Sequence, residues 1–206
     1  MTVDPSTGLD SEFTFDTFVQ DGGNAFALAS ARAVAADHGA IHNPLYLFGP
    51  RASGKTHLLH AIGNEILRVH PRMRVRYLTA DAFVSEFMKA LQVQGEETFR
   101  VKFRHETGVL LLDDVEEFSG RERTQVELFD VFNALRDRAG CIVLASKRYP
   151  RDAGLTDRLS SRFASGLVAD VETLGREGRL AIVRRLASEI GPALQGDVET
   201  FLARHI

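Results

Sequence analysis

The chain contains the stretch LYLFGPRASGKT at residues 45–56, an apolar run followed by a glycine-rich turn that ends in Lys-Thr. The spacing from Gly49 to Thr56 is G-x-x-x-x-G-K-[ST], which is typical of a phosphate-binding loop between a strand and a helix. Polyphosphate is densely anionic, so its site needs N–H groups at a helix N-terminus, a cation and a hydroxyl for Mg²⁺. Gly49 and Gly54 permit the tight turn, Lys55 would reach the β- and γ-phosphates, and Thr56 would bind Mg²⁺.

The alternative to a nucleotide site is a chance match in a glycine-rich turn. The apolar run before the turn and the helical stretch after it, residues 57–67, argue against chance. The candidate nucleotide ligands are the whole loop and the residue after it, namely Gly49, Pro50, Arg51, Ala52, Ser53, Gly54, Lys55, Thr56 and His57.

The composition indicates a globular chain with one sizeable core, since the chain has 206 residues and 44% of them are hydrophobic. The apolar runs, such as residues 109–112, are too short to span a bilayer, and the first residues are acidic where a signal peptide would be basic. A soluble, cytoplasmic protein is expected. The net charge of -3 argues against non-specific duplex binding as the main activity. Cys141 lies in an apolar run and is expected to be a small buried residue.

From residue 45 onward, short apolar runs alternate with longer amphipathic segments. The predicted strands are residues 45–48, 75–78, 109–113, 141–146 and 167–169, and the predicted helices are 55–67, 81–91, 96–104, 124–138 and 156–163. This alternation predicts an α/β fold with a parallel sheet covered on both faces and ligands at the carboxyl ends of its strands. Beyond residue 170 the strands stop, and residues 175–190 and 196–205 predict two helices that begin a lid.

The strand at residues 109–113 ends in two acids, Asp113 and Asp114. A phosphate-binding loop needs such a partner on a neighbouring strand, where Asp113 would hold Mg²⁺, usually through water, and Asp114 would polarise the attacking water or sense the metal. The alternative is an ordinary aspartate-rich turn after a strand. The position of the pair about 60 residues after Lys55 favours the metal-binding interpretation.

The chain resembles the AAA+ ATPase domain of the bacterial replication initiators of the DnaA family. The resemblance covers residue 13 to the end, and it is carried in order by FTFDTFV at 13–19, NPLYLFG at 43–49, GKTHLLHA at 54–61, FDVFNAL at 129–135 and DRLSSRF at 157–163. It implies a P-loop AAA+ five-stranded parallel sheet flanked by helices. The implied division is a polar tail at 1–12, the nucleotide-binding domain at 13–172, and the beginning of a truncated helical lid at 173–206.

The resemblance also implies roles for residues that bind nucleotide. Phe18, Val19 and Asn24 match the lining of the adenine pocket, although the alternation of phenylalanines from residue 13 to 18 also fits a strand-like staple on the core. Arg162 matches the arginine finger that reaches the γ-phosphate of a neighbouring subunit, and Arg158 matches an arginine of the same interface. The alternative for Arg162 is a helix-surface arginine in weak local pairs.

Four further residues match positions that contact single-stranded DNA. Met88 and Lys89 lie in the helical segment 81–104 that distinguishes initiators from other AAA+ proteins, and Arg121 and Arg123 follow the acid pair. An apolar side chain such as Met88 can pack against a base or sugar, while the cationic side chains bind phosphates, and this combination suits the binding of single-stranded DNA. A solvated basic helix face is the alternative.

The chain departs from the family at Lys147, where the family usually has Asp after the fourth strand. An ammonium can hold a γ-phosphate but cannot accept a proton from water, so this departure predicts weak ATPase activity with nucleotide binding retained. On this basis the candidate catalytic residues are Asp114, Lys147 and Arg162.

The function implied by the resemblance is an ATP-binding, nucleotide-dependent assembly switch in DNA replication initiation, with contact to single-stranded DNA. ATP and Mg²⁺ are the expected cofactors, and self-association through Arg162 is expected. The alternatives are a shortened regulator that binds the full-length initiator and controls its ATP hydrolysis, or a DnaC-like loader of the replicative helicase. The N-terminus lacks a clamp-binding peptide for the first alternative and is short for the second.

Overall fold

In the computed structural model, which describes residues 3–191 and 196–205, five parallel strands form one sheet in the order β2-β3-β4-β1-β5. The strands are β1 (Leu45–Phe48), β2 (Val75–Thr79), β3 (Val109–Asp113), β4 (Cys141–Ser146) and β5 (Leu167–Asp170). All five predicted strands are confirmed, and β2 and β5 are each one residue longer than predicted. The acid pair was expected on the strand next to β1. This expectation is wrong, because β4 lies between β1 and β3. Parallel strands still end at one edge of the sheet, so the phosphate loop and the acid pair share that edge.

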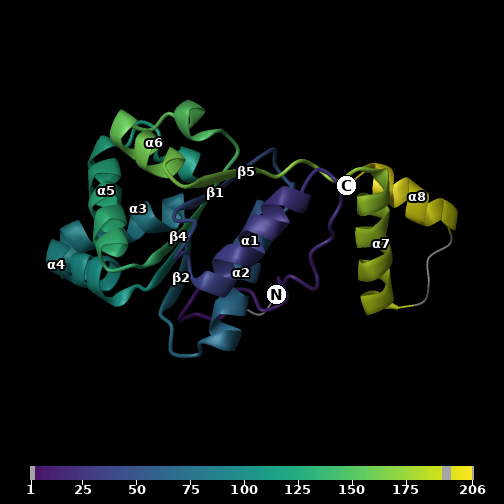
Figure 1. Ribbon diagram of the computed structural model, residues 1–206, viewed down its shortest axis with the longest axis horizontal. Coiled ribbons are helices and arrows are strands. Elements are labelled where there is room, and N and C mark those ends of the chain that lie inside the picture. Colours follow the sequence, from purple (N-terminus) through teal and green to yellow (C-terminus); the bar gives the residue numbers. More distant parts are fainter. Residues whose placement is uncertain (1–2, 192–195, 206) are drawn as a thin grey trace.

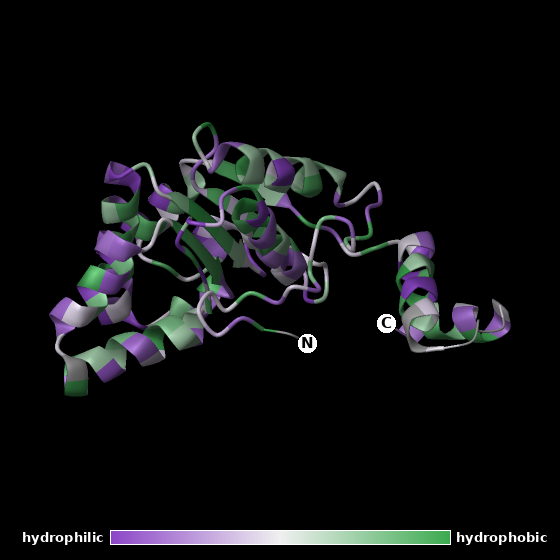
Figure 2. Cartoon of the chain, turned by 90° about the horizontal axis from the view of Figure 1, so that it is seen from below, coloured by the Kyte–Doolittle hydropathy of each residue, from purple (hydrophilic) through white to green (hydrophobic). Residues whose placement is uncertain are grey.

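The side chains of each strand alternate between two apolar cores, one on each face of the sheet. In β3, Val109 and Leu111 belong to one core and Leu110 and Leu112 to the other. Helices α1 (Ala25–Asp37) and α2 (Lys55–Val69) cover the first face, while α3 (Ala80–Lys89), α4 (Glu96–Arg100), α5 (Glu122–Asp137) and α6 (Asp157–Ala164) lie on the second (Figure 1). Burial on both faces explains the continuous apolar runs of the strands, which Figure 2 shows in green.

Helix α1 was not predicted from the sequence. Its residues read AFALASARAVAAD, so the face that packs on the core is made largely of small side chains. Ala27, Ala31 and Ala35 are buried at a spacing of four residues. Alanine spacing is a weak signal of amphipathicity, although alanine is the best helix former.

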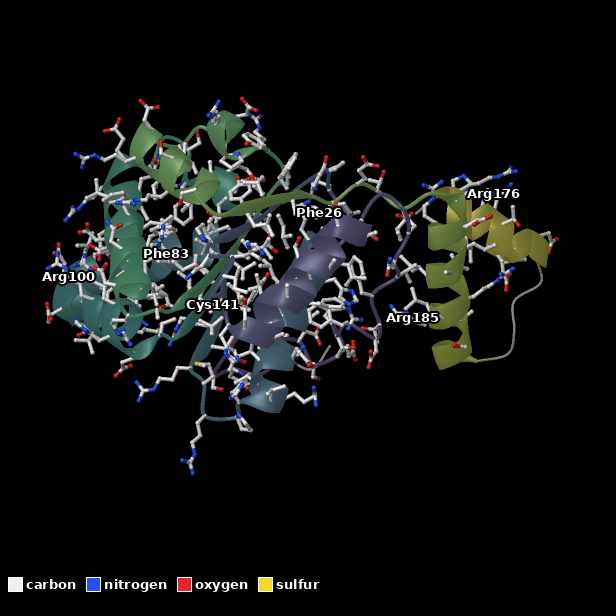
Figure 3. All side chains as sticks on the ribbon, in the orientation of Figure 1. Phe26, Phe83, Arg100, Cys141, Arg176 and Arg185 are labelled. Carbon is white, nitrogen blue, oxygen red and sulfur yellow. The ribbon has the colours of Figure 1, made fainter. Side chains whose placement is uncertain are left out.

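The two helices predicted at 81–91 and 96–104 are each interrupted. Helix α3 continues as a π-turn, η1 (Ala90–Gln94), and α4 continues as η2 (Val101–Glu106). The aromatic cluster under these turns is tight, since the rings of Phe99 and Phe103 are 4.4 Å apart and Phe83 is 5.2 Å and 5.1 Å from them. Phe83 lies among the helices of this face (Figure 3). A π-turn adds one residue to a turn of the helix without requiring any particular residue type, so composition does not mark it.

The other elements differ only slightly from the prediction. Helix α5 starts two residues earlier than expected and α6 one residue later, and short 3₁₀ turns follow β3 at η3 (Val115–Phe118) and β4 at η4 (Pro150–Asp152). Cys141 is buried as expected, at 1% exposure.

The N-terminal segment is packed against the body of the domain. Leu9 and Asp10, within the segment expected to be a polar tail, are 2% and 1% exposed, and the Tyr77 N–H of β2 donates to the Thr7 carbonyl at 2.8 Å. Residues 11–24 form turns and loops, so the strand-like form considered as an alternative for the phenylalanines is wrong. Their expected packing is confirmed for Phe15, which is buried in the core.

The two helices predicted beyond the sheet are present, and their role as the start of a lid stays a prediction. Helices α7 (Arg176–Ile190) and α8 (Gly196–His205) stand beside the sheet domain (Figures 1 and 2). They are joined by Arg179, whose Nε donates to the Ala203 carbonyl at 2.8 Å, and by an Arg184–Glu199 ion pair at 2.9 Å.

Candidate nucleotide-binding site

The loop from Gly49 to Thr56 connects β1 to α2 and requires glycine at two positions. A Cβ on Gly49 would lie 2.2 Å from the Val171 carbonyl oxygen, and Gly54 has φ +99° with Phe18 lying 2.9 Å from the place of its Cβ. No side chain fits at either position, since real Cβ atoms do not approach other atoms this closely. The loop backbone therefore folds tightly around the N-terminus of α2.

Lys55 is the first residue of α2 and is only 7% exposed. Its ammonium donates to the carbonyls of Gly49 at 2.8 Å and Pro50 at 2.5 Å, and to the Ser53 hydroxyl at 3.3 Å. Burial lowers the pKa of Lys55, and the carboxylate of Asp113 opposes that shift. The ammonium thus lies inside the loop, and it must exchange these carbonyls for phosphate oxygens when an anion binds.

Thr56 and Asp113 meet where α2 begins and β3 ends. The Thr56 hydroxyl donates to Oδ2 of Asp113 at 2.6 Å, the Tyr77 hydroxyl donates to the same oxygen at 3.2 Å, and the Asp114 N–H donates to Oδ1 at 2.9 Å. Burial raises the pKa of Asp113, which is 4% exposed. A hydroxyl and a buried carboxylate form an oxygen donor pair of the kind that Mg²⁺ prefers, so these residues fit the expected metal.

The second acid, Asp114, lies beside the residue that departs from the family. Asp114 adopts a left-handed conformation, φ 52° and ψ 44°, and its Oδ1 is 3.3 Å from the ammonium of Lys147. Lys147 also pairs with Glu116 at 3.0 Å. Sequence reasoning missed Glu116, although the acid-rich run of residues 113–117 contained a signal for it.

The predicted lining of the base pocket gathers around the N-terminus of α1. Asn24 is 1% exposed, donates to the Val19 carbonyl at 3.1 Å and accepts the Asp21 N–H at 3.0 Å. Phe18 lies over Gly54 and packs edge-on against the His57 ring, with 5.2 Å between the ring centroids. Of the other loop residues, Pro50, Arg51 and Ala52 are exposed.

The two arginines expected at a subunit interface are exposed on α6. The guanidinium carbons of Arg158 and Arg162 are each 5.9 Å from the centroid of the Phe129 ring. Together with Asp157 and Ser161 they line an open hollow of about 660 Å³.

The residues expected to contact DNA lie on two neighbouring elements, and both arginines are paired with acids. Met88 at the end of α3 is 44% exposed and Lys89 is also exposed. Arg121 pairs with Asp81 of α3 at 2.7 Å. Arg123 pairs with Glu96 of α4 at 3.3 Å. The surface is therefore of mixed charge.

No helix within residues 3–191 and 196–205 has the length and apolar character needed to cross a membrane.

The fold and site define a class of protein. A sheet in the order β2-β3-β4-β1-β5, a phosphate loop after β1, an acid pair after β3 and a helical pair after β5 are the features of an AAA+ P-loop domain. More narrowly, the chain belongs to the family of bacterial DnaA ATPase domains, whose model matches residues 9–170.

Known proteins of this family cover nearly the whole chain. The chromosomal replication initiator protein DnaA of Geobacter sulfurreducens is 43% identical over 201 residues, which is 97% of this chain and 45% of that protein. The chain thus spans less than half the length of this curated relative. Domain III of the Thermotoga maritima replication initiation protein DnaA has a TM-score of 0.91 at 38% identity, covering 96% of this chain and 82% of that one. A replication initiator DnaA bound to AMPPCP and single-stranded DNA has a TM-score of 0.86 at 34% identity, covering 96% and 61%.

Proposed function

We propose that the chain is an ATP-binding AAA+ module of the DnaA type that acts as a nucleotide-dependent assembly switch in DNA replication initiation. The observation that carries the proposal is the meeting of Thr56 with Asp113, at 2.6 Å, beside the buried ammonium of Lys55. A solved relative that holds AMPPCP and single-stranded DNA supports the same ligands for this chain.

ATP binding at the loop would proceed by exchange of partners. The β- and γ-phosphates would replace the carbonyls of Gly49 and Pro50 as hydrogen-bond acceptors for the Lys55 ammonium. The N–H groups at the start of α2 would donate to phosphate oxygens. Thr56 and Asp113 would hold Mg²⁺, which neutralises phosphate charge when bound. The adenine base would lie against Phe18 and against the loop of residues 19–24, which the Asn24 side chain holds together by hydrogen bonds to Val19 and Asp21.

Assembly would use the exposed arginines of α6. A guanidinium that reaches a neighbour's γ-phosphate links the nucleotide state to self-association, because ADP lacks the group it contacts. Arg162 and Arg158 are exposed, as such a role requires.

Contact with single-stranded DNA would use the mixed-charge surface of Met88, Lys89, Arg121 and Arg123. Phosphates would compete with Asp81 and Glu96 for the two arginines. Exposed ion pairs contribute little energy, so this exchange costs little. A replication role would place the protein in the cytoplasm with the chromosome.

The test measures ATP binding and self-association of the full chain. Fluorescent ATP should bind in the presence of Mg²⁺, and light scattering should increase with ATP. Arg162→Ala should bind ATP normally but assemble poorly, while Arg72→Ala, an exposed arginine at the opposite edge of the sheet, should behave as wild type. Equal assembly of Arg162→Ala and wild type would refute the interface role, and failure of the wild type to bind ATP would refute the site.

The identity of 43% to an initiator over almost the whole chain favours the initiator module over the two alternatives, a regulator of the initiator and a helicase loader. A regulator should increase ATP hydrolysis by the full-length initiator when it is added to that protein, and a helicase loader should bind the replicative helicase, whereas the initiator module requires neither result.

A further inference from the structure

Lys147 occupies the space between the acid pair of β3 and the first turn after it. Its ammonium lies 3.3 Å from Oδ1 of Asp114, 3.0 Å from Oε1 of Glu116 and 3.8 Å from Oε1 of Glu117. One cation from the end of β4 therefore contacts three carboxylates that follow β3.

The ion pair is held in place from the buried side. The Glu116 side chain is 10% exposed, and its Oε2 accepts hydrogen bonds from the Ser146 hydroxyl at 2.8 Å and from the Lys147 backbone N–H at 3.2 Å. Ser146 is fully buried. The hydrogen bond from Lys147 to Glu116 raises the pKa of Lys147, so its ammonium stays charged at neutral pH. The position of Nζ is thus fixed by buried groups and not only by a surface contact.

The same ammonium lies within electrostatic range of the phosphate loop. Asp113, Glu116 and Asp114 each raise the pKa of Lys55 against the effect of burial, whereas the charge of Lys147 lowers it. The Lys147 cluster and the loop lysine therefore belong to one electrostatic site.

Hydrolysis of ATP at this site needs a group that accepts a proton. The oxygen of a water molecule attacks the γ-phosphorus, and the bond from that phosphorus to the oxygen bridging the β- and γ-phosphates breaks. The bridging oxygen leaves with ADP, and the proton of the water passes first to a base and finally to solvent. In the acid pair, Asp113 accepts a hydrogen bond from Thr56, so Asp114 is the carboxylate available to accept a proton from the water. The ion pair with Lys147 occupies Oδ1 of this carboxylate, and the ammonium itself has no acceptor for the proton.

We propose that Lys147 is a positioning residue that acts as a brake on ATP hydrolysis, by holding the Asp114 carboxylate in an ion pair anchored through Glu116. The proposal rests on the proposed function, because it requires ATP at the loop. The ammonium of Lys147 is engaged with these acids, so its removal should affect turnover more than ATP binding. The chain would then keep ATP bound for long periods, as a switch does.

The test compares ATP turnover and ATP affinity in variants of the full chain. Lys147→Asn removes the ammonium, and its kcat should exceed that of wild type by about tenfold or more, within the range of general-base effects, while KM changes by less than about threefold. Lys147→Arg keeps a cation beside Asp114 and should increase kcat much less. Lys102→Gln removes an ammonium paired with Glu86 outside this site and should leave turnover unchanged.

A second variant covers the case in which Lys147→Asn does not fold, as judged by its thermal unfolding. Glu116→Gln weakens the anchor without changing Lys147 or Asp114, and it should also increase kcat. Unchanged kcat in the folded variants, or equal increases for Asn and Arg at position 147, would overturn the proposal. If the wild type fails to bind ATP, the proposed function itself fails, whereas wild type that binds ATP and already turns over as fast as Lys147→Asn refutes only the brake.

Discussion

The Thr56 hydroxyl donates to Oδ2 of Asp113 at 2.6 Å, across the join between the start of α2 and the end of β3. These residues lie 57 positions apart in the sequence. The contact places an oxygen pair at the edge of the sheet where β1 and β3 both end, although β4 separates the two strands. The candidate metal ligands are thereby held by the end of a central strand and the start of a helix.

Asp113→Asn should weaken metal binding without lowering the thermal stability of the domain. If Asp113 holds Mg²⁺ as proposed, loss of its carboxylate should weaken Mg²⁺-dependent ATP binding by about 10- to 100-fold. Burial raises the pKa of Asp113, so its charged form destabilises the folded state. For an acid with a raised pKa, stability is lost as pH increases through that range, and the neutral Asn avoids this loss. Thermal unfolding at pH 7 should therefore show a variant at least as stable as wild type. A large fall in stability would show that the hydrogen bonds to Asp113 outweigh its burial.

Gly54→Ala should destabilise the loop and abolish nucleotide binding. The new Cβ would lie 2.9 Å from Phe18 Cε2, at a residue with φ +99°. Backbone strain of this kind costs about 1–3 kcal/mol, and the clash adds to it. Chemical denaturation and binding of fluorescent ATP would measure the two effects.

The matched control is Gly120→Ala, since Gly120 also has positive φ, +73°, but no atom within 4 Å of the new Cβ. Gly120→Ala should lose the stability that backbone strain costs, without the further loss caused by a clash with Phe18, and it should still bind nucleotide. Equal losses in the two variants would contradict the role assigned to the contact with Phe18.

The parts of the site that were predictable are those encoded by local spacing. The order of strand, loop and helix around Lys55 and the acids at the end of an apolar run are both visible in short windows, and the structure brings them together. The pairing of Lys147 with Asp114 was not visible, because it depends on β3 and β4 being neighbours in the sheet. The positive charge of residue 147 was thus visible in the sequence, but its partners were not.

The parts of the fold that were missed lacked a distinctive periodic signal. Helix α1 packs through alanines, which are common in many settings, and the π-turns after α3 and α4 mix apolar and polar residues in a way that also fits a regular helix. The N-terminal segment packs through Leu9 and Asp10, whose partners lie far along the chain, as in the hydrogen bond from the Asp10 N–H to Nδ1 of His60. Long-range contacts of this kind have no signature in local composition.

Arg123→Ala should weaken binding of single-stranded DNA and reduce its dependence on salt. If Arg123 contacts one phosphate, the slope of log affinity against log salt should fall by about 0.7. Its side chain is 71% exposed and pairs with Glu96 at 3.3 Å. Glu96→Gln removes that competing acid and should strengthen binding. Fluorescence anisotropy at several salt concentrations provides the measurement, and identical slopes for wild type and Arg123→Ala would exclude the phosphate contact.

His60 should make the domain lose stability as the pH falls below about 6.5. Burial lowers the pKa of His60 from 6.5 to about 4, and its Nδ1 accepts the Asp10 N–H at 3.1 Å. A base with a lowered pKa is protonated in the unfolded chain before the folded one, so stability is lost between these two pH values as acid is added. Within that window one extra proton on the unfolded chain corresponds to about 1.4 kcal/mol per pH unit.

His60→Gln removes the titrating group and keeps an acceptor for the Asp10 N–H. Chemical denaturation from pH 7 to 4.5 should give a shallower fall in the free energy of unfolding for this variant than for wild type. The carboxylates titrate in both proteins, so the difference between the two curves isolates His60. Parallel curves would mean that His60 takes up a proton equally in the folded and unfolded chains, in which case its burial beside Tyr77 and the Asp10 contact would not control its charge.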